Sequence, residues 1–143
     1  MRDLLHSLGA ALAIPPATYS ADNTPAAVDL SGFESAMIAI QVGVGGITFD
    51  TTNKVEFKLT HSDDDSTYTA VAATDVLGVA SVGTGGIVKA LTAAHASADV
   101  TNIGYIGGKK YIKLLPDFSG THGTGTPIAA LVVKGNARSR PTA

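Results

Sequence analysis

Residues 54–71, KVEFKLTHSDDDSTYTAV, decide the fold class of this chain. Hydrophobic side chains occupy every second position from Val55 to Leu59, and a period of two predicts a strand with one buried face. This pattern ends at residues 62–66, SDDDS, because such short polar side chains hydrogen-bond their own backbone and favour turns. β-forming residues resume at 67–71, so the segment predicts one β-hairpin with an acidic tip.

Short apolar segments separated by Gly, Asp and Asn continue along the rest of the chain. The segments that we expect to be strands are residues 27–30, 35–42, 54–61, 67–71, 87–91, 102–105, 110–115 and 128–134. Many short strands in one domain predict an all-β fold, an antiparallel, jelly-roll-like β-sandwich. The segment 128–133, IAALVV, is apolar on both faces, which predicts a central strand that is covered on each side.

The first 25 residues are predicted to form an extended arm that carries a short helix and precedes a sandwich domain at 26–136. Asp3 can cap this helix, and Pro15 ends it. An apolar stripe on a helix this short needs a surface to cover it, either its own sandwich or a neighbouring subunit, and we expect the neighbour. The stripe consists of Leu4, Leu5, Leu8 and Leu12. Residues 137–143 form a C-terminal tail.

Composition limits the classes of function. The 143 residues suit one domain, and the absence of cysteine excludes disulfides and thiolate metal sites. Charged residues make up 15% of the chain, against about 25% in typical soluble domains. With a net charge of only −2, the chain is expected to present a weakly polar surface that suits contact with other proteins. No segment approaches the roughly 18 apolar residues of a membrane span, so no membrane partner is expected.

The polar clusters favour structural roles over chemistry. Asp63, Asp64 and Asp65 could offer oxygen ligands to a calcium ion, but the spacing of an EF-hand is missing and a solvated turn is the preferred interpretation. The histidines are scattered without a zinc-type spacing; they are His6, His61, His95 and His122. We therefore expect neither a metal site nor a cofactor.

Catalysis and nucleic-acid binding are also disfavoured. The chain has no nucleophile elbow, and its glycine-rich stretch at 83–86 lacks the Lys-Ser/Thr ending of a phosphate loop, so we expect no enzyme. Lys134, Arg138 and Arg140 form a sparse basic tail on a slightly acidic chain. Together with Lys109 and Lys110 they make a poor electrostatic footprint for nucleic acid.

Five segments carry a resemblance when their order and spacing are taken together. They are MRDL at 1–4, VDLSGFESA at 28–36, FKLTHSDDDSTY at 57–68, GYIGGKKYIK at 104–113 and ALVVKG at 130–135. In this order they resemble a family of small proteins encoded among the head genes of tailed phages and prophages. The resemblance spans the chain.

The resemblance implies a virion structural protein, most plausibly a decoration or cement protein on the outer surface of the head. It would be made in the host cytoplasm, bind the major capsid protein and form a homotrimer, with one monomer per capsid subunit as the alternative. A head-spike, neck or tail component is a rival function for the same sandwich. A carbohydrate-binding sandwich is another, although the chain has no Trp and only four Tyr to stack on sugars.

Overall fold

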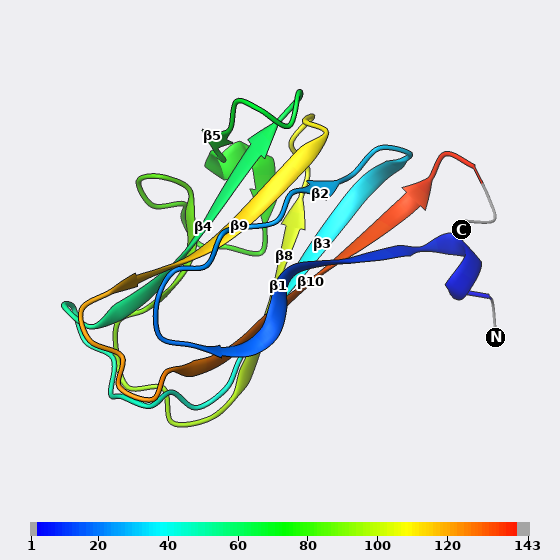
Figure 1. Cartoon of the computed structure of the whole chain (residues 1–143). Coiled ribbons are helices and arrows are strands. Elements are labelled where there is room, and N and C mark those ends of the chain that lie inside the picture. The colour runs from blue at the N-terminus through cyan, green and yellow to red at the C-terminus, as the bar shows by residue number, and fades with distance from the viewer. Residues whose placement is uncertain (1–2, 140–143) are drawn as a thin grey trace.

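Two antiparallel sheets pack face to face in the computed structural model, which describes residues 3–139 (Figure 1). The first sheet has the strand order β1-β10-β3-β8-β6, and the second has β2-β9-β4-β5 with β7 also paired to β4. The strands of the first sheet are β1 (Gly9–Tyr19), β3 (Phe33–Val42), β6 (Val76–Leu77), β8 (Asp99–Tyr105) and β10 (Thr126–Ala137). Those of the second sheet are β2 (Val28–Asp29), β4 (Lys54–Ser62), β5 (Thr69–Ala70), β7 (Ile87–Leu91) and β9 (Tyr111–Ser119).

The connections between the strands are those of a jelly roll. When the short edge strands β5 and β6 are left aside, the strand order is β1-β10-β3-β8 in the first sheet and β2-β9-β4-β7 in the second. Strands β4 and β7 are neighbours in one sheet, whereas every other connection in this series crosses from one sheet to the other. Two such sheets joined in this way form the jelly-roll sandwich. The predicted all-β antiparallel sandwich is therefore confirmed.

The core lies between the sheets and is built by the alternation that the sequence shows. Val55, Phe57 and Leu59 of β4 are fully buried, and β4 runs along the centre of the second sheet beside β9. Ile38 and Ile40 of β3 face them from the first sheet and are equally inaccessible. Burying a large aliphatic or aromatic side chain stabilises a fold by about 1.5–3 kcal/mol, so these alternating positions hold the two layers together.

All eight predicted strands exist, with ends that differ by a few residues. The hairpin predicted at 54–71 is formed by β4 and β5, which pair Thr60 with Ala70 and His61 with Thr69. Residues 92–98 form the loop between β7 and β8. Strands β1 and β6 were not predicted. Strand β10 is central, between β1 and β3, but the chain itself covers only its inner face.

The N-terminal region differs most from the prediction. The only helical element among the described residues of this region is one 3-10 turn, η1 (Leu5–Ser7). The prediction of a helix that continues to Pro15 is wrong, because β1 begins at Gly9. When residues 9–19 pair with β10, their backbone forms hydrogen bonds to that strand, and Ala13 and Ile14 become buried in the core. A short isolated helix would leave these two side chains uncovered. Edge strands tolerate proline, and β1 accommodates Pro15 and Pro16 with irregularities in its register.

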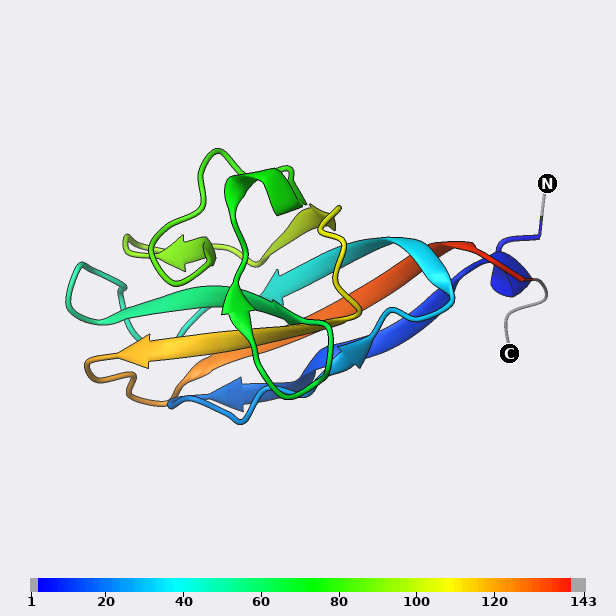
Figure 2. The same cartoon turned by 90° about the horizontal axis from the view of Figure 1, so that it is seen from above.

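Both termini lie at the same end of the sandwich. Figure 1 and Figure 2 show η1 and the end of β10 projecting together beyond the other strands. The projecting arm is therefore limited to the few residues before Gly9, instead of the 25 expected. Strand β10 ends at Ala137, the first residue of the predicted C-terminal tail. Residues 1–2 and 140–143, which include Arg140 of the predicted tail, lie outside the described residues.

Candidate assembly surfaces

The four leucines predicted to form one stripe lie in two different places. Leu4 and Leu5 are 66% and 79% exposed and sit in the projecting N-terminal segment at 3–8, which we call the hook. Leu8 is half-buried at the base of the hook. Leu12 lies in β1, opposite Leu131 of β10, and is exposed on the outer face of the first sheet. The structure therefore brings Leu4 and Leu5 together and separates Leu12 from them.

A local hydrogen-bond network gives the hook its shape. The backbone amide of His6 donates to Asp3 Oδ1, and the His6 ring lies 2.5 Å from Asp3 Oδ2. The Ser7 hydroxyl donates to the backbone oxygen of Asp3. The hydrogen bond with the His6 side chain lowers the pKa of Asp3. Asp3 thus holds one tight turn, and this turn presents Leu4 and Leu5 to the solvent.

The outer face of the first sheet carries many of the exposed apolar side chains, among them Leu12, Leu77 and Val100. Register and alternation place three cross-strand rows of outward side chains there, the longest running from Ala10 through Val133, Met37 and Gly104 to Leu77. None of the outward residues of these rows is charged. We call this surface the uncharged face. It consists of Ala10, Leu12, Met37, Ala39, Gln41, Leu77, Val100, Asn102, Gly104, Ala129, Leu131 and Val133.

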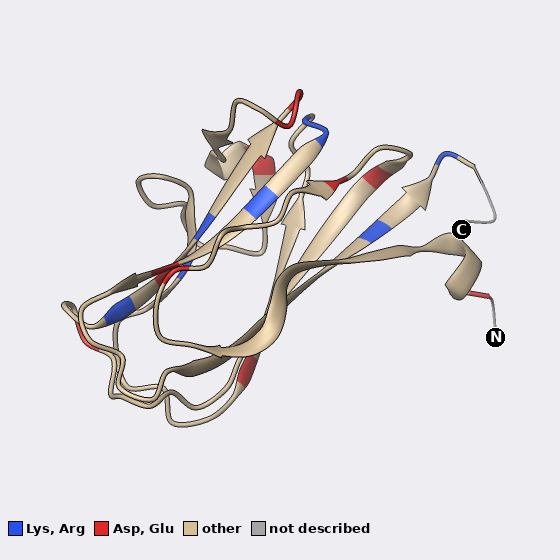
Figure 3. Ribbon diagram, in the orientation of Figure 1, with Lys and Arg blue, Asp and Glu red and all other residues tan. Residues whose placement is uncertain are grey.

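The outer face of the second sheet has the opposite chemistry. Lys54 pairs with Glu56 at 2.7 Å, and Lys58 pairs with Asp117 of the adjacent strand. That hydrogen bond with Asp117 raises the pKa of Lys58. In Figure 3, charged residues recur along β4 and β9, whereas β3, β8 and β10 carry them only near their ends. The outer face of the second sheet is therefore charged and suited to solvent, whereas the outer face of the first sheet is uncharged.

Two hollows adjoin these surfaces. A groove of about 490 Å³ continues the uncharged face at one end and is lined by Pro16, Thr18, Gln41, Val100, Pro127 and Ala129 among others. A second cleft, of about 620 Å³, lies between the turn after β2 and the loop after β8. Two ion pairs lie in its lining, since Lys109 lies 3.4 Å from Asp63 and Arg138 lies 3.5 Å from Glu34.

The acidic tip of the hairpin is organised as a turn by one of its three aspartates. Asp64 Oδ1 accepts hydrogen bonds from the backbone amides of Ser66 and Thr67 and from the Ser62 hydroxyl. These donors lower the pKa of Asp64 to about 2. Asp65 adopts a positive φ of 56°, as the tight turn requires. Across residues 3–139, no group of three or more His, Asp or Glu side chains is arranged to hold a metal ion.

Three histidines that look scattered in the sequence have structural partners. His95 and His122 both pack against Phe49, with ring centroids 6.5 and 6.3 Å apart. His61 is buried, and its Nδ1 lies 3.0 Å from the Tyr105 hydroxyl. Burial lowers the pKa of His61 because desolvation disfavours the charged ring. These contacts could not be predicted from the sequence, since they join loops and strands that are distant along the chain.

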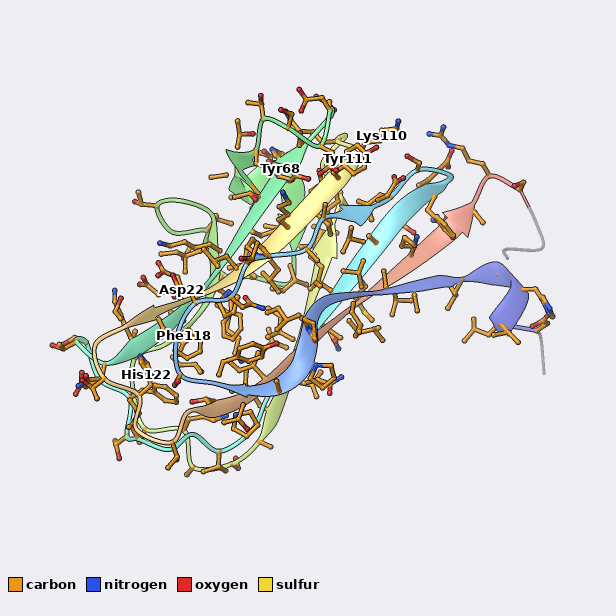
Figure 4. The ribbon with its side chains drawn as sticks, in the orientation of Figure 1. Asp22, Tyr68, Lys110, Tyr111, Phe118 and His122 are labelled. Carbon is orange, nitrogen blue, oxygen red and sulfur yellow. The ribbon has the colours of Figure 1, made fainter. Side chains whose placement is uncertain are left out.

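Two tyrosines lie at the hairpin end of the second sheet (Figure 4). The Lys113 ammonium sits 4.0 Å from the centroid of the Tyr68 ring, and the Tyr68 hydroxyl donates to Asp65. Tyr111 has Lys110 near its ring, at 5.7 Å. A sugar that stacks on an aromatic ring needs an open ring face, and Lys113 covers one face of Tyr68. This arrangement weakens the case for a carbohydrate site here.

Comparison with known proteins places no further constraint on the chain, because it matches no protein-family model, no curated protein and no solved structure. Within the described part of the chain, no helix has the length and apolar character needed to cross a membrane. The strand order and the surface chemistry are therefore the observations from which a function has to be inferred.

Proposed function

We propose that this protein is a structural component of a phage virion and that it decorates the outer surface of the capsid. In this role it binds the major capsid protein and stabilises the assembled head. The jelly roll supplies a rigid body, a fold that recurs among viral capsid domains. Its location is the capsid surface, and it carries out no catalysis. The sequence resemblance to head-gene proteins supports the same role.

The observation that carries this proposal is the hook with its two exposed leucines. Leu4 and Leu5 lie outside the core of the sandwich, on a turn that Asp3 holds in one shape. Burying most of two leucine side chains contributes roughly 2–4 kcal/mol to an interface. A preorganised apolar hook at the end of a rigid domain is suited to insert between neighbouring subunits of a lattice. Binding to the assembled lattice alone would then stabilise it by mass action.

Binding to heads tests the proposal directly. Purified protein is mixed with undecorated heads encoded by the same genome, and the bound fraction is measured after sedimentation. We expect the double variant Leu4→Ser, Leu5→Ser to bind at least about tenfold more weakly, which corresponds to a loss of about 1.4 kcal/mol or more.

The control is Val44→Ser, which removes an apolar side chain that is 55% exposed in a loop of the sandwich domain. This control should bind like the unmodified protein. Equal binding by the hook variant and the control would show that the hook does not make the contact. No binding by the unmodified protein would reject decoration altogether.

A further inference from the structure

Strand β10 is covered on only one of its two apolar faces. Ile128, Ala130 and Val132 point into the core and are fully buried. Ala129, Leu131 and Val133 alternate with them, point outward and are only half-buried. Strands that are apolar on both faces are found where both sides are covered. The described part of the chain supplies no cover for this outer side, so a partner is needed to bury it.

The side chains of the uncharged face differ in size in a pattern that suits packing against another sheet. Small residues alternate with large ones across it: Ala39 lies between Leu131 and Asn102, and Gly104 lies between Met37 and Leu77. Alternating hollows and projections are the pattern by which stacked sheets interdigitate at a spacing of about 10 Å. The outermost apolar side chains are well exposed, with Leu77 at 56% and Val100 at 60%.

The polar groups on this face point to an identical partner. The face carries two hydrogen-bonding side chains, Gln41 and Asn102, and both are neutral amides. Each amide has a donor and an acceptor, so it can pair with the same amide of another copy. When a two-fold axis relates two copies, a residue near the axis contacts the same residue of the other copy. A charged residue at such a position would therefore face a like charge. An uncharged face with amide groups avoids this repulsion.

The size of the face indicates reversible association. Adjacent strands lie about 4.8 Å apart, and outward residues follow each other about 6.8 Å apart along a strand, so each of the twelve outward residues covers about 33 Å². One copy would therefore contribute about 390 Å² and two copies about 780 Å², which is the size of a weak, transient contact and not of a stable dimer interface. The groove beside Pro127 and Val100 extends the same surface beyond this area.

We propose that the uncharged face is the contact between copies of this chain. The occupant of the face is a second copy, which packs its own outer sheet against it with Asn102 close to its counterpart. Capsid decoration is a separate proposal, since the hook and the uncharged face are different surfaces. A failure of one leaves the other intact, because association between copies is measured without heads.

Sedimentation velocity of the purified full chain tests this proposal. Over a concentration range of about 1 to 300 µM, we expect the mass to rise from one copy to two, as mass action requires for a weak interface between identical faces. The variant Asn102→Lys places an ammonium on the face and should remain monomeric throughout that range. Thr60→Lys adds the same charge to the outer face of the second sheet and should associate like the unmodified protein.

A mixing experiment distinguishes contact between identical faces from any other mode of association. Asn102→Lys and Asn102→Asp should each be monomeric alone, whereas an equimolar mixture should regain the mass of the associated form. Circular dichroism checks that each variant keeps its β-sheet signal. The proposal is overturned if the unmodified protein stays monomeric at every concentration. It is equally overturned if Asn102→Lys still associates, or if the mixture stays monomeric.

Discussion

Replacing Ile14 with alanine tests whether β1 belongs to the sandwich. Ile14 lies opposite Ala130 of β10, and its side chain is fully buried in the core. The sequence pattern placed the same residue in an arm outside the domain. These two interpretations predict different stabilities, because removing a side chain from an external arm leaves the core unchanged.

The expected loss of stability follows from complete burial. Removing three carbons from a buried isoleucine forfeits their transfer free energy and leaves a cavity, and such changes lower the free energy of unfolding by about 2–5 kcal/mol. For a chain of 143 residues, each 1 kcal/mol shifts the melting temperature by about 2–4 °C. We therefore expect Ile14→Ala to melt at least about 5 °C below the unmodified protein.

Differential scanning calorimetry measures this shift. Leu5→Ala is the matched control, because Leu5 is 79% exposed in the hook and its truncation should change the melting temperature by no more than about 1 °C. Deleting residues 1–8 should likewise preserve the fold, whereas deleting 1–16 should destroy it by removing residues 9–16, which are most of β1. A melting temperature for Ile14→Ala equal to that of the control would refute the assignment of β1 to the core.

Three further predictions concern other parts of the chain. Burial lowers the pKa of His61 in the folded state, so the free energy of unfolding is highest above about pH 6.5 and decreases as the pH falls below that value. Chemical denaturation between about pH 5 and 8 should show a smaller decrease for His61→Gln than for the unmodified protein. Both Gly86 and Gly32 have positive φ, but a Cβ on Gly86 would lie 2.3 Å from a backbone oxygen and one on Gly32 would touch nothing. Chemical denaturation should therefore show a larger loss for Gly86→Ala than for Gly32→Ala. An NMR titration should give Asp64 a pKa of about 2, and replacing Ser62 with alanine should raise it.

The strands of the domain body could be predicted from the sequence because their signals are local. In β4 the alternation of buried and polar residues is strict, and the turn that follows contains Asp64, whose side chain accepts the backbone amides of the tip. Strand β7 was predicted with the correct ends at Ile87 and Leu91. These features depend on neighbouring residues, so they can be recognised without knowledge of the fold.

Strand β1 could not be predicted because its conformation depends on a distant partner. The spacing of Leu4, Leu8 and Leu12 fits a helix, and Pro15 offers a plausible end for it. The pairing of residues 9–19 with β10 outweighs that preference, although more than a hundred residues separate the two strands. The two-residue strand β6 was missed because so short a segment has no periodicity to detect.

The candidate surfaces were predicted only in part for the same reason. Leu4 and Leu5 were predicted to be contact residues and are exposed in the hook, whereas Leu12, expected on the same stripe, is exposed on the uncharged face. The uncharged face could not be recognised, since it joins outward residues of five strands whose register the sequence does not reveal. A low fraction of charged residues was the only hint that such a face exists.

The number of copies in an intact particle tests the proposed function most directly. Quantitative mass spectrometry of purified virions gives the ratio of this chain to the major capsid protein, and cryo-electron microscopy gives its position. Decoration predicts a copy number that approaches that of the major capsid protein, with density spread over the outer lattice. About a dozen copies or fewer, confined to one vertex as in a neck or tail, would contradict it.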